Sequence, residues 1–271
     1  MSLINGQPAE TVDIRDRGLA YGDGLFETIA VLHGQAEHLE RHLARLETGC
    51  RRLSISAPDR HVLRDEVQEV AGNETRVIKI ILTRGVGGRG YRKPENPSPT
   101  RIVTADPWPD YPETFENDGV RVRLCRQRLA RNPALAGIKH LNRLEQVLAR
   151  SEWVDTSIAE GLMLDDTGHV IEATQSNVFF VHAGVLVTPA LDQAGVAGVV
   201  REVVLEHAER DGISCEVRDV DQAEIREFEE MFLTNSVIGI WPVKEYEGHP
   251  FKQMDMAKII ADHIVQRPIT A

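Results

Sequence analysis

A proline-rich stretch without hydrophobic periodicity divides the chain into two patterned parts. It spans residues 107–119 and contains three prolines and several acidic residues. Such a composition suits an exposed connection better than a helix or a strand. The chain has 271 residues, of which 42% are hydrophobic, so it can fill two compact cores. We therefore predict an N-terminal α/β domain at 1–108, an interdomain linker at 109–119 and a larger C-terminal domain at 120–271.

The part before this stretch combines helical and strand patterns. Apolar residues at steps of three and four predict a helix over residues 39–53, and a second helix is expected over 58–71, with proline in its first turn. Apolar, largely β-branched runs predict strands at 25–32, 76–83 and 101–105. This part is therefore expected to form an α+β layer.

Short strand patterns dominate the part that follows. Period-two alternation over residues 120–125 predicts a half-buried strand, and apolar residues between Leu141 and Leu148 predict a helix. Further strands are expected at 162–164, 169–173, 177–181 and 185–188.

Charge and cysteine content exclude several classes of protein. The net charge of -11 argues against a general nucleic-acid binder, because phosphate contacts require a dense basic surface. Cys50, Cys125 and Cys215 are widely separated, and His140 has no second ligand four residues on, so we expect neither a disulfide framework nor a metal site. No secretory leader pattern and no run of 18 apolar residues occur. We therefore expect a cytoplasmic protein without a membrane partner.

The segment Arg84–Tyr91 contains a formal G-x-G-x-x-G pattern behind a predicted strand. In a dinucleotide site a helix begins directly after this pattern, whereas three prolines lie between residues 91 and 99 here. A surface loop is one alternative. We prefer a functional loop that presents Arg84 and Arg89.

Three further features each have a structural and a chemical interpretation. Lys139 precedes a predicted helix and is either a solvated charge or a catalyst. Glu172 interrupts an apolar strand, so it requires a partner, either in a buried salt bridge or in a protonated heterocycle. Gly195–Arg201 introduces an apolar-periodic stretch and is either an ordinary helix entry or a phosphate-binding helix start.

These features lie in separate blocks that occur in a specific order along nearly the whole chain. The blocks are Tyr21–Thr28, His42 with Arg45–Leu46, Arg84–Tyr91, Gly137–Gln146, Glu172–Phe179 and Leu191–Arg201. In these blocks the chain resembles the aminodeoxychorismate lyases. They belong to the fold-type IV pyridoxal phosphate family, which also contains branched-chain and D-amino acid aminotransferases.

The resemblance implies a fold and an assembly. The expected fold class is α+β (α/β), with a smaller N-terminal α/β domain and a larger C-terminal domain that binds pyridoxal 5'-phosphate around a β-barrel-like core. The family also implies a homodimer with each active site near the interface.

The resemblance further implies roles for single residues. Lys139 and Glu172 are the expected catalytic residues, with Lys139 holding the cofactor covalently and Glu172 facing its pyridine nitrogen. The expected phosphate ligands are Arg45, the N–H groups of Val199 and Val200, and Ser236. The expected substrate-binding residues are Arg89, Arg84, Tyr91 and Asn142.

The implied reaction is the conversion of 4-amino-4-deoxychorismate to 4-aminobenzoate and pyruvate in folate biosynthesis. Lys139 would remove a proton from the amine-bearing ring carbon, and elimination of pyruvate would make the ring aromatic. This would be a carbon-oxygen lyase. The alternatives are a fold-type IV aminotransferase for branched-chain or D-amino acids, and a binding homologue without activity.

Overall fold

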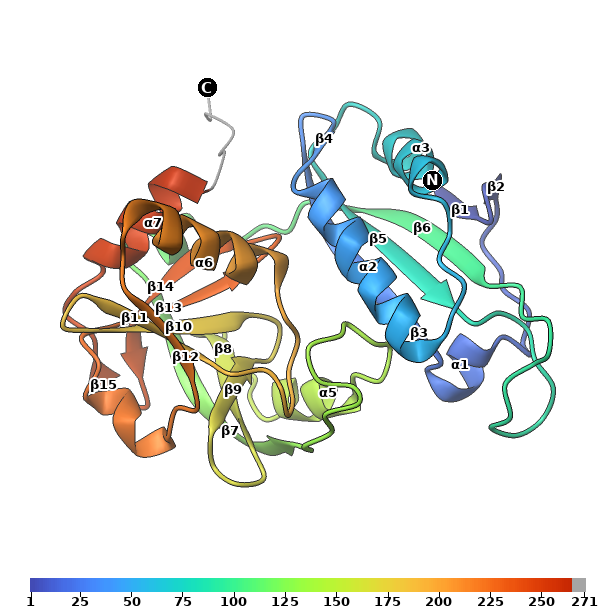
Figure 1. Ribbon diagram of the computed structural model, residues 1–271. Helices are drawn as coiled ribbons and strands as arrows, with labels where there is room; N and C mark the ends of the chain where they lie inside the picture. Colours follow the sequence, from blue (N-terminus) through green and yellow to red (C-terminus); the bar gives the residue numbers. More distant parts are fainter. Residues whose placement is uncertain (265–271) are drawn as a thin grey trace. The chain divides into compact units, whose positions relative to one another are not determined.

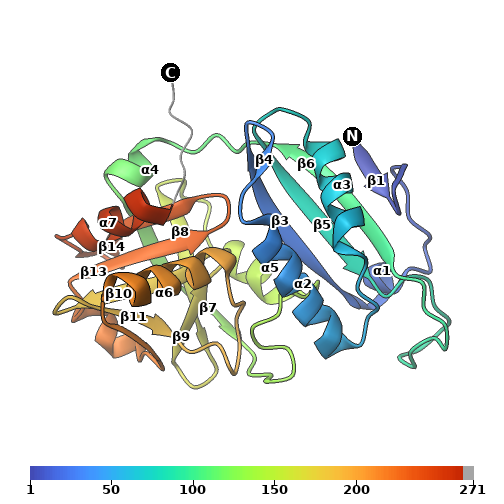
Figure 2. The same cartoon turned by 45° about the horizontal axis from the view of Figure 1, so that its top comes forward.

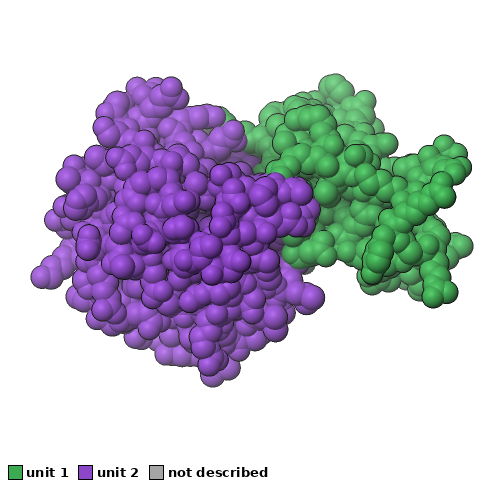
Figure 3. All heavy atoms as spheres, turned by 60° about the horizontal axis from the view of Figure 1, so that its bottom comes forward, with its two compact units in different colours: residues 1–109, 138–142 green, residues 110–137, 143–271 purple. Residues whose placement is uncertain are grey.

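The computed structural model describes residues 1–264 and divides the chain into two compact units. Unit 1 comprises residues 1–109 and 138–142, and unit 2 comprises residues 110–137 and the chain from residue 143 onward (Figure 3). The structure thus divides the chain within the predicted linker. Residues 138–142, which lie in the predicted C-terminal domain, belong to unit 1.

Unit 1 is built on a six-stranded sheet in the order β2-β1-β6-β5-β3-β4, with antiparallel pairing throughout (Figure 1). The strands are β1 Ser2–Ile4, β2 Gln7–Pro8, β3 Gly24–Leu32, β4 Gln35–Ala36, β5 Arg76–Thr83 and β6 Thr100–Pro107. The helices are α1 Arg17–Tyr21, α2 Leu39–Leu53 and α3 Arg60–Ala71. The predicted strand at 76–83 and the predicted helix at 39–53 are confirmed residue for residue.

Helices α2 and α3 cover one face of this sheet (Figure 2). The α2 side chains Leu43, Leu46 and Cys50 are buried, as their spacing along one stripe predicts. Helix α3 begins at Arg60, two residues later than predicted, because the Asp59 carboxylate accepts the backbone N–H of His61 at 2.7 Å and so caps the helix.

Residues 138–142 extend the sheet of unit 1 along the N-terminal half of β3. The backbone N–H of Phe26 donates to the carbonyl of Lys139 at 3.0 Å, and the N–H of Leu141 donates to the carbonyl of Gly24 at 3.0 Å. A Cβ on Gly24 would lie 2.5 Å from the Leu82 carbonyl oxygen, so only glycine fits between the two neighbours. The helix predicted from Leu141 is therefore shorter, because Leu141 belongs to this sheet edge.

Unit 2 contains a nine-stranded sheet in the order β12-β11-β10-β13-β14-β7-β8-β9, with β15 paired to β14. Its strands are β7 Val120–Leu129, β8 Ile158–Asp165, β9 Val170–Ala173, β10 Asn177–His182, β11 Val185–Pro189, β12 Cys215–Arg218, β13 Glu230–Asn235, β14 Gly239–Tyr246 and β15 His249–Pro250. Its helices are α4 Thr114–Asn117, α5 Leu144–Arg150, α6 Val199–Asp211, the 3-10 helix η1 Gln222–Arg226 and α7 Asp255–Ile264.

The sheet of unit 2 curls around an apolar core. Seven of its strands contribute buried side chains to one cluster, which a flat sheet could not bring together. The contributors include Val122, Leu162, Val170, Val178, Val187, Leu233 and Val243. Helices α6 and α7 pack against a second cluster that includes Phe179 and Phe232. The predicted α+β class with a barrel-like core in the larger unit is thereby confirmed.

The predicted linker carries the short helix α4, which packs on unit 2. Phe115 of α4 lies against the apolar cluster of that unit, and its ring centroid is 5.1 Å from that of Trp241. Most of the segment 109–119 is thus part of unit 2. Among residues 1–264, no helix has both the length and the apolar character that a membrane span requires.

Candidate active site

Lys139 lies against an aromatic ring in unit 1. Its ammonium nitrogen is 4.5 Å from the centroid of the Phe26 ring, and its backbone carbonyl accepts the N–H of the same residue. The side chain is only partly buried. Strand β3 therefore sets both the backbone position of Lys139 and the surface on which its side chain rests.

A buried ionic group follows Phe26 on the same strand. The Glu27 carboxylate lies 2.7 Å from His42 Nδ1 and 2.9 Å from Arg45 Nε, and it also accepts a bond from Arg45 Nη2. Burial raises the pKa of Glu27, but the charge of Arg45 and the hydrogen bond from His42 outweigh it and lower the pKa to about 2. Burial lowers the pKa of His42. Arg45, a predicted phosphate ligand, is thus oriented by a carboxylate.

Glu27 is not among the site residues predicted from the sequence, although a signal for it is present. Glu27 is a carboxylate within the apolar run of β3, which is the same kind of signal that singled out Glu172 in β9. A buried carboxylate requires a partner. The pair of basic residues on α2 supplies it.

Glu172 is buried in unit 2, where it accepts hydrogen bonds from a backbone N–H and from a side-chain amide. Its Oε2 accepts the backbone N–H of Val196 at 2.8 Å, and its Oε1 accepts the side-chain amide of Gln146 at 3.4 Å. Burial lowers the pKa of Arg143, whereas the nearby charge of Glu172 raises it. Gly195 adopts φ +82°, and a Cβ there would lie 2.7 Å from the side chain of Ile171. This close approach allows the following backbone to reach Glu172.

Helix α6 begins three residues beyond Val196. Its N-cap is Gly198, so no side chain caps the first turn that contains Val199 and Val200. The buried amide of Asn177 holds the turn by donating to the Val196 carbonyl at 2.8 Å. The predicted helix start is confirmed. Segment 195–200 thus brings the Glu172 carboxylate and an anion-favouring helix start together within unit 2.

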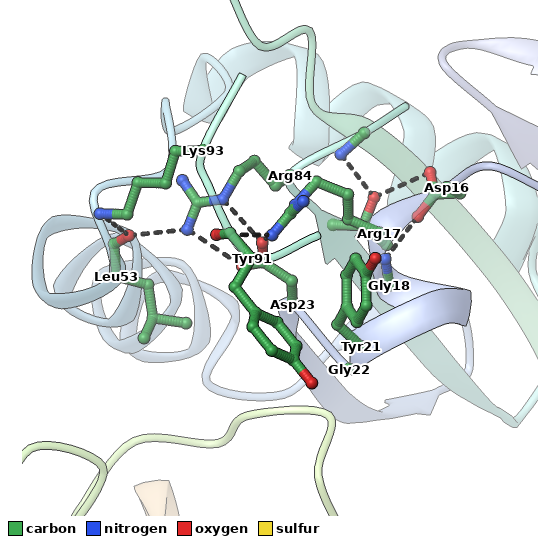
Figure 4. Close-up of polar contacts among 12 residues, drawn as sticks. Asp16, Arg17, Gly18, Tyr21, Gly22, Asp23, Leu53, Arg84, Tyr91 and Lys93 are labelled. Atoms are coloured by element: carbon green, nitrogen blue, oxygen red, sulfur yellow. Dashed lines mark hydrogen bonds and ion pairs between the residues drawn. The ribbon is translucent and has the colours of Figure 1, made fainter. Parts of the chain in front are cut away.

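Residues 84–99 form a loop with no helix behind the glycine pattern, so the dinucleotide interpretation is excluded. At the base of the loop, Arg84 donates to Asp23 at 2.8 and 3.0 Å and to the carbonyl of Leu53 (Figure 4). It also donates to the carbonyl of Ser54. A substrate carboxylate would have to compete with these bonds. Arg89 and Tyr91 lie farther along the loop and are exposed.

The predicted site residues are distributed over both units. Unit 1 carries Lys139, Arg45, Arg84, Arg89, Tyr91 and Asn142, and unit 2 carries Glu172, Val199, Val200 and Ser236. Asn142 donates to the carbonyl of Gly22 at 3.1 Å, and Ser236 follows β13 at a half-buried position. In the described part of the chain, no group of three or more His, Cys, Asp or Glu side chains could hold a metal ion.

Comparison with known proteins places this architecture in a family. Residues 24–246 match the model of the class IV aminotransferases. The chain belongs to this family, as the sequence resemblance predicted.

Among individual proteins, the chain is similar to an aminodeoxychorismate lyase of Vibrio harveyi, with 38% identity over 90% of each chain. It also resembles the crystal structure of 4-amino-4-deoxychorismate lyase from Pseudomonas aeruginosa, with 50% identity, 97% coverage of both chains and a TM-score of 0.92. A D-alanine aminotransferase of Listeria monocytogenes is 29% identical over 91% of this chain and 87% of its own length.

Proposed function

We propose that this protein is a pyridoxal phosphate-dependent lyase that converts 4-amino-4-deoxychorismate to 4-aminobenzoate and pyruvate. The observation that carries the proposal is the 50% identity over 97% of both chains to a lyase of that name, at a TM-score of 0.92. The second lyase, at 38% identity, supports the same reaction. Each unit also carries residues that suit a reaction dependent on pyridoxal phosphate.

The donor sets fit pyridoxal phosphate. In unit 2, Glu172 is a buried carboxylate close to the start of α6, so one short segment could serve both the pyridine nitrogen and the phosphate. Val199, Val200 and Ser236 would hold the phosphate there. In unit 1, Lys139 supplies an amine and Arg45 a guanidinium suited to a dianion.

The chain's own residues would bind the cofactor, orient the substrate and move a proton. When bound, the cofactor supplies an electron sink for the carbon that bears the substrate's amine. Glu172 would keep the pyridine nitrogen protonated. The Lys139 amine would hold the cofactor and then take the proton from the amine-bearing ring carbon. Arg89 and Tyr91, with Asn142 and Arg84 as further polar groups, would orient the substrate's two carboxylates.

The decisive experiment combines product analysis with mapping of the cofactor. Incubation with 4-amino-4-deoxychorismate should release pyruvate and 4-aminobenzoate in equal amounts, and Lys139→Ala should abolish both products. Borohydride treatment of the holoenzyme should attach the cofactor to the peptide that contains Lys139. Lys79→Ala is a matched control, because its nitrogen also lies by the Phe26 ring, at 5.3 Å from the centroid. A trapped adduct that persists in Lys139→Ala would overturn the assignment.

An aminotransferase is the second candidate, since a D-alanine aminotransferase is 29% identical to the chain. An aminotransferase would use the same cofactor as the proposed lyase, with the same roles for Lys139 and Glu172. Incubation with D-alanine or leucine and 2-oxoglutarate distinguishes the two. Formation of the amine form of the cofactor without pyruvate from 4-amino-4-deoxychorismate would favour the aminotransferase.

We also propose that the protein is a homodimer. Three apolar side chains on α5 support this, because Leu144, Val147 and Leu148 are each more than half exposed. Exposed apolar stripes of this kind typically mark contacts between proteins.

A further inference from the structure

Arg17 is a buried cation at the inner side of the loop 84–99. Its side chain is 4% exposed, and its Nε donates to Asp23 at 2.8 Å. Its Nη1 donates to the carbonyl of Gly90 at 3.0 Å. Its Nη2 donates to the carbonyl of Tyr91 at 3.4 Å (Figure 4). A single guanidinium therefore joins Asp23, the residue before β3, to residues 87–91, which we term the loop tip.

Tyr21 reinforces the same connection from the end of α1. Its hydroxyl oxygen accepts the backbone N–H of Gly90 at 3.0 Å. Its ring lies beneath the Arg17 guanidinium at 4.8 Å, and meets the Tyr91 ring edge-on at 5.4 Å. Gly90 is thus held at both its N–H and its carbonyl, by two different side chains.

The glycines of the loop tip fit this arrangement. A Cβ on Gly87 would lie 2.7 Å from Arg17 Cδ, so the backbone rests directly on the arginine side chain. Gly90 adopts φ +90°, a conformation that other residues rarely adopt. The contacts between the tip and Arg17 therefore depend on backbone groups as well as on side chains.

Asp23, which pairs with Arg17 at the base of the loop 84–99, is also firmly held. Burial raises the pKa of Asp23, but hydrogen bonds from Arg84 and Arg17 outweigh it and keep the pKa below its usual value. Asp23 remains an anion between two buried guanidinium groups. Its backbone carbonyl accepts the N–H of Arg84, and the next residue, Gly24, accepts the N–H of Leu141. The consecutive residues Asp23 and Gly24 thus border both the loop and the segment that carries Lys139.

We propose that Arg17 and Tyr21 are positioning residues that hold the loop tip in the conformation presenting Arg89 to a substrate carboxylate. The inference rests on the proposed function and deepens it. Asp23 directly precedes β3, and β3 holds the backbone of Lys139. Arg17 and Tyr21 therefore set where Arg89 lies relative to the Lys139 amine. Losing them releases the loop tip and weakens substrate binding, while the proton transfer at Lys139 continues.

The test measures loop protection and kinetics on the same holoenzyme variants. Tyr21→Phe removes only the acceptor of the Gly90 N–H, and Arg17→Met removes the guanidinium and keeps a long apolar side chain. Amide hydrogen exchange in a peptide covering residues 86–92 should become about tenfold faster in each variant. KM for 4-amino-4-deoxychorismate should rise about tenfold and kcat should stay within about twofold.

Matched controls separate this effect from general destabilisation. Arg15→Met removes an exposed arginine whose side chain pairs with Asp13, and Tyr111→Phe removes a hydroxyl in unit 2. Neither should change exchange in the loop tip or KM. Borohydride labelling at Lys139 should be retained in all four variants, which shows that each one folds and binds cofactor.

Two results would overturn the inference. The first is unchanged exchange at the loop tip in both Tyr21→Phe and Arg17→Met, because the loop would then be held by other contacts. The second is faster exchange without any rise in KM, because the loop tip would then not bind substrate. Failure of the proposed function is distinguishable from both, since the unmodified enzyme would then release no pyruvate.

Discussion

At the scale of single residues, the structure contains two buried carboxylates on strands with different partners. Glu172 accepts a backbone N–H and a side-chain amide, whereas Glu27 is paired with the cation Arg45 and with His42. The charge of Arg143 also lies near Glu172, and we propose that this carboxylate faces the protonated pyridine nitrogen of the cofactor. A carboxylate paired with arginine instead orients that arginine. In this proposal the same residue type has two different roles, which depend on its neighbours.

The pairing of Glu27 predicts a pH-dependent contribution to stability. Its pKa is lowered from 4.5 to about 2, so the paired carboxylate stabilises the folded state on the order of 3 kcal/mol. Because the folded-state pKa is depressed, this contribution is fully present above about pH 5 and is lost as the pH falls toward 2. Glu27→Gln should therefore lower the free energy of unfolding at pH 7, and the difference from the unmodified protein should shrink in acid.

Urea unfolding at pH 7, 5, 4 and 3 measures this difference. Glu74→Gln is the control, because Glu74 is 70% exposed in its pair with Arg76 and such pairs contribute little. A difference for Glu27→Gln that stays constant from pH 7 to pH 3 would contradict the assignment of this charge.

At the scale of elements, local sequence patterns predicted the helices that bury one apolar stripe and the strands that bury one apolar face. Helix α2 and strand β5 match their predicted bounds because their apolar spacing alone determines which face is buried. Helix α5 begins at Leu144 instead of Leu141, because Leu141 pairs with Gly24, more than a hundred residues earlier in the chain. A local pattern cannot reveal a partner at that separation.

The start of α6 allows a prediction at this scale. A Cβ on Gly198 would lie 2.0 Å from Asn177 Oδ1, so Gly198→Ala must displace the amide that holds the Val196 carbonyl. We expect the dissociation constant for pyridoxal phosphate to rise about tenfold, because the N–H groups at the helix start would shift. Fluorescence titration of the apoenzyme with the cofactor measures this change.

The control for Gly198→Ala lies at the other end of the same helix. Gly212→Ala meets no neighbour within 4 Å, but it places alanine at φ +71°. It should lower stability by about 1 kcal/mol and leave cofactor affinity unchanged. Equal losses of affinity in the two variants would show that general destabilisation is responsible.

At the scale of the whole molecule, the chain does not divide simply into a first and a second part. Residues 138–142 belong to unit 1 although both neighbouring segments belong to unit 2. The backbone of Lys139 is consequently fixed by β3, while Glu172 is fixed by β9 and the turn before α6. The exposed apolar residues of α5 are the basis of the proposed homodimer.

The proposed dimer predicts that a charge on α5 changes the oligomeric state. Val147 is 56% exposed, so Val147→Glu should be tolerated by the folded subunit and should oppose burial of the stripe in an interface. Sedimentation velocity should show a dimer for the unmodified protein and a monomer for this variant. Val217→Glu, at a similarly exposed position on β12, should remain dimeric. A monomeric unmodified protein would contradict the proposal.

The sequence by itself determined the family, the fold class and the segments around Lys139, Glu172 and the start of α6. These follow from short motifs and from apolar periodicity, which are properties of neighbouring residues. Only the tertiary structure revealed that Glu27 orients Arg45, that Arg84 is occupied by Asp23, and that Arg17 holds the loop tip. The physical reason is that an ion pair or a backbone contact is formed by residues far apart in the chain. Until the strands pair, nothing specifies which charge will meet which partner.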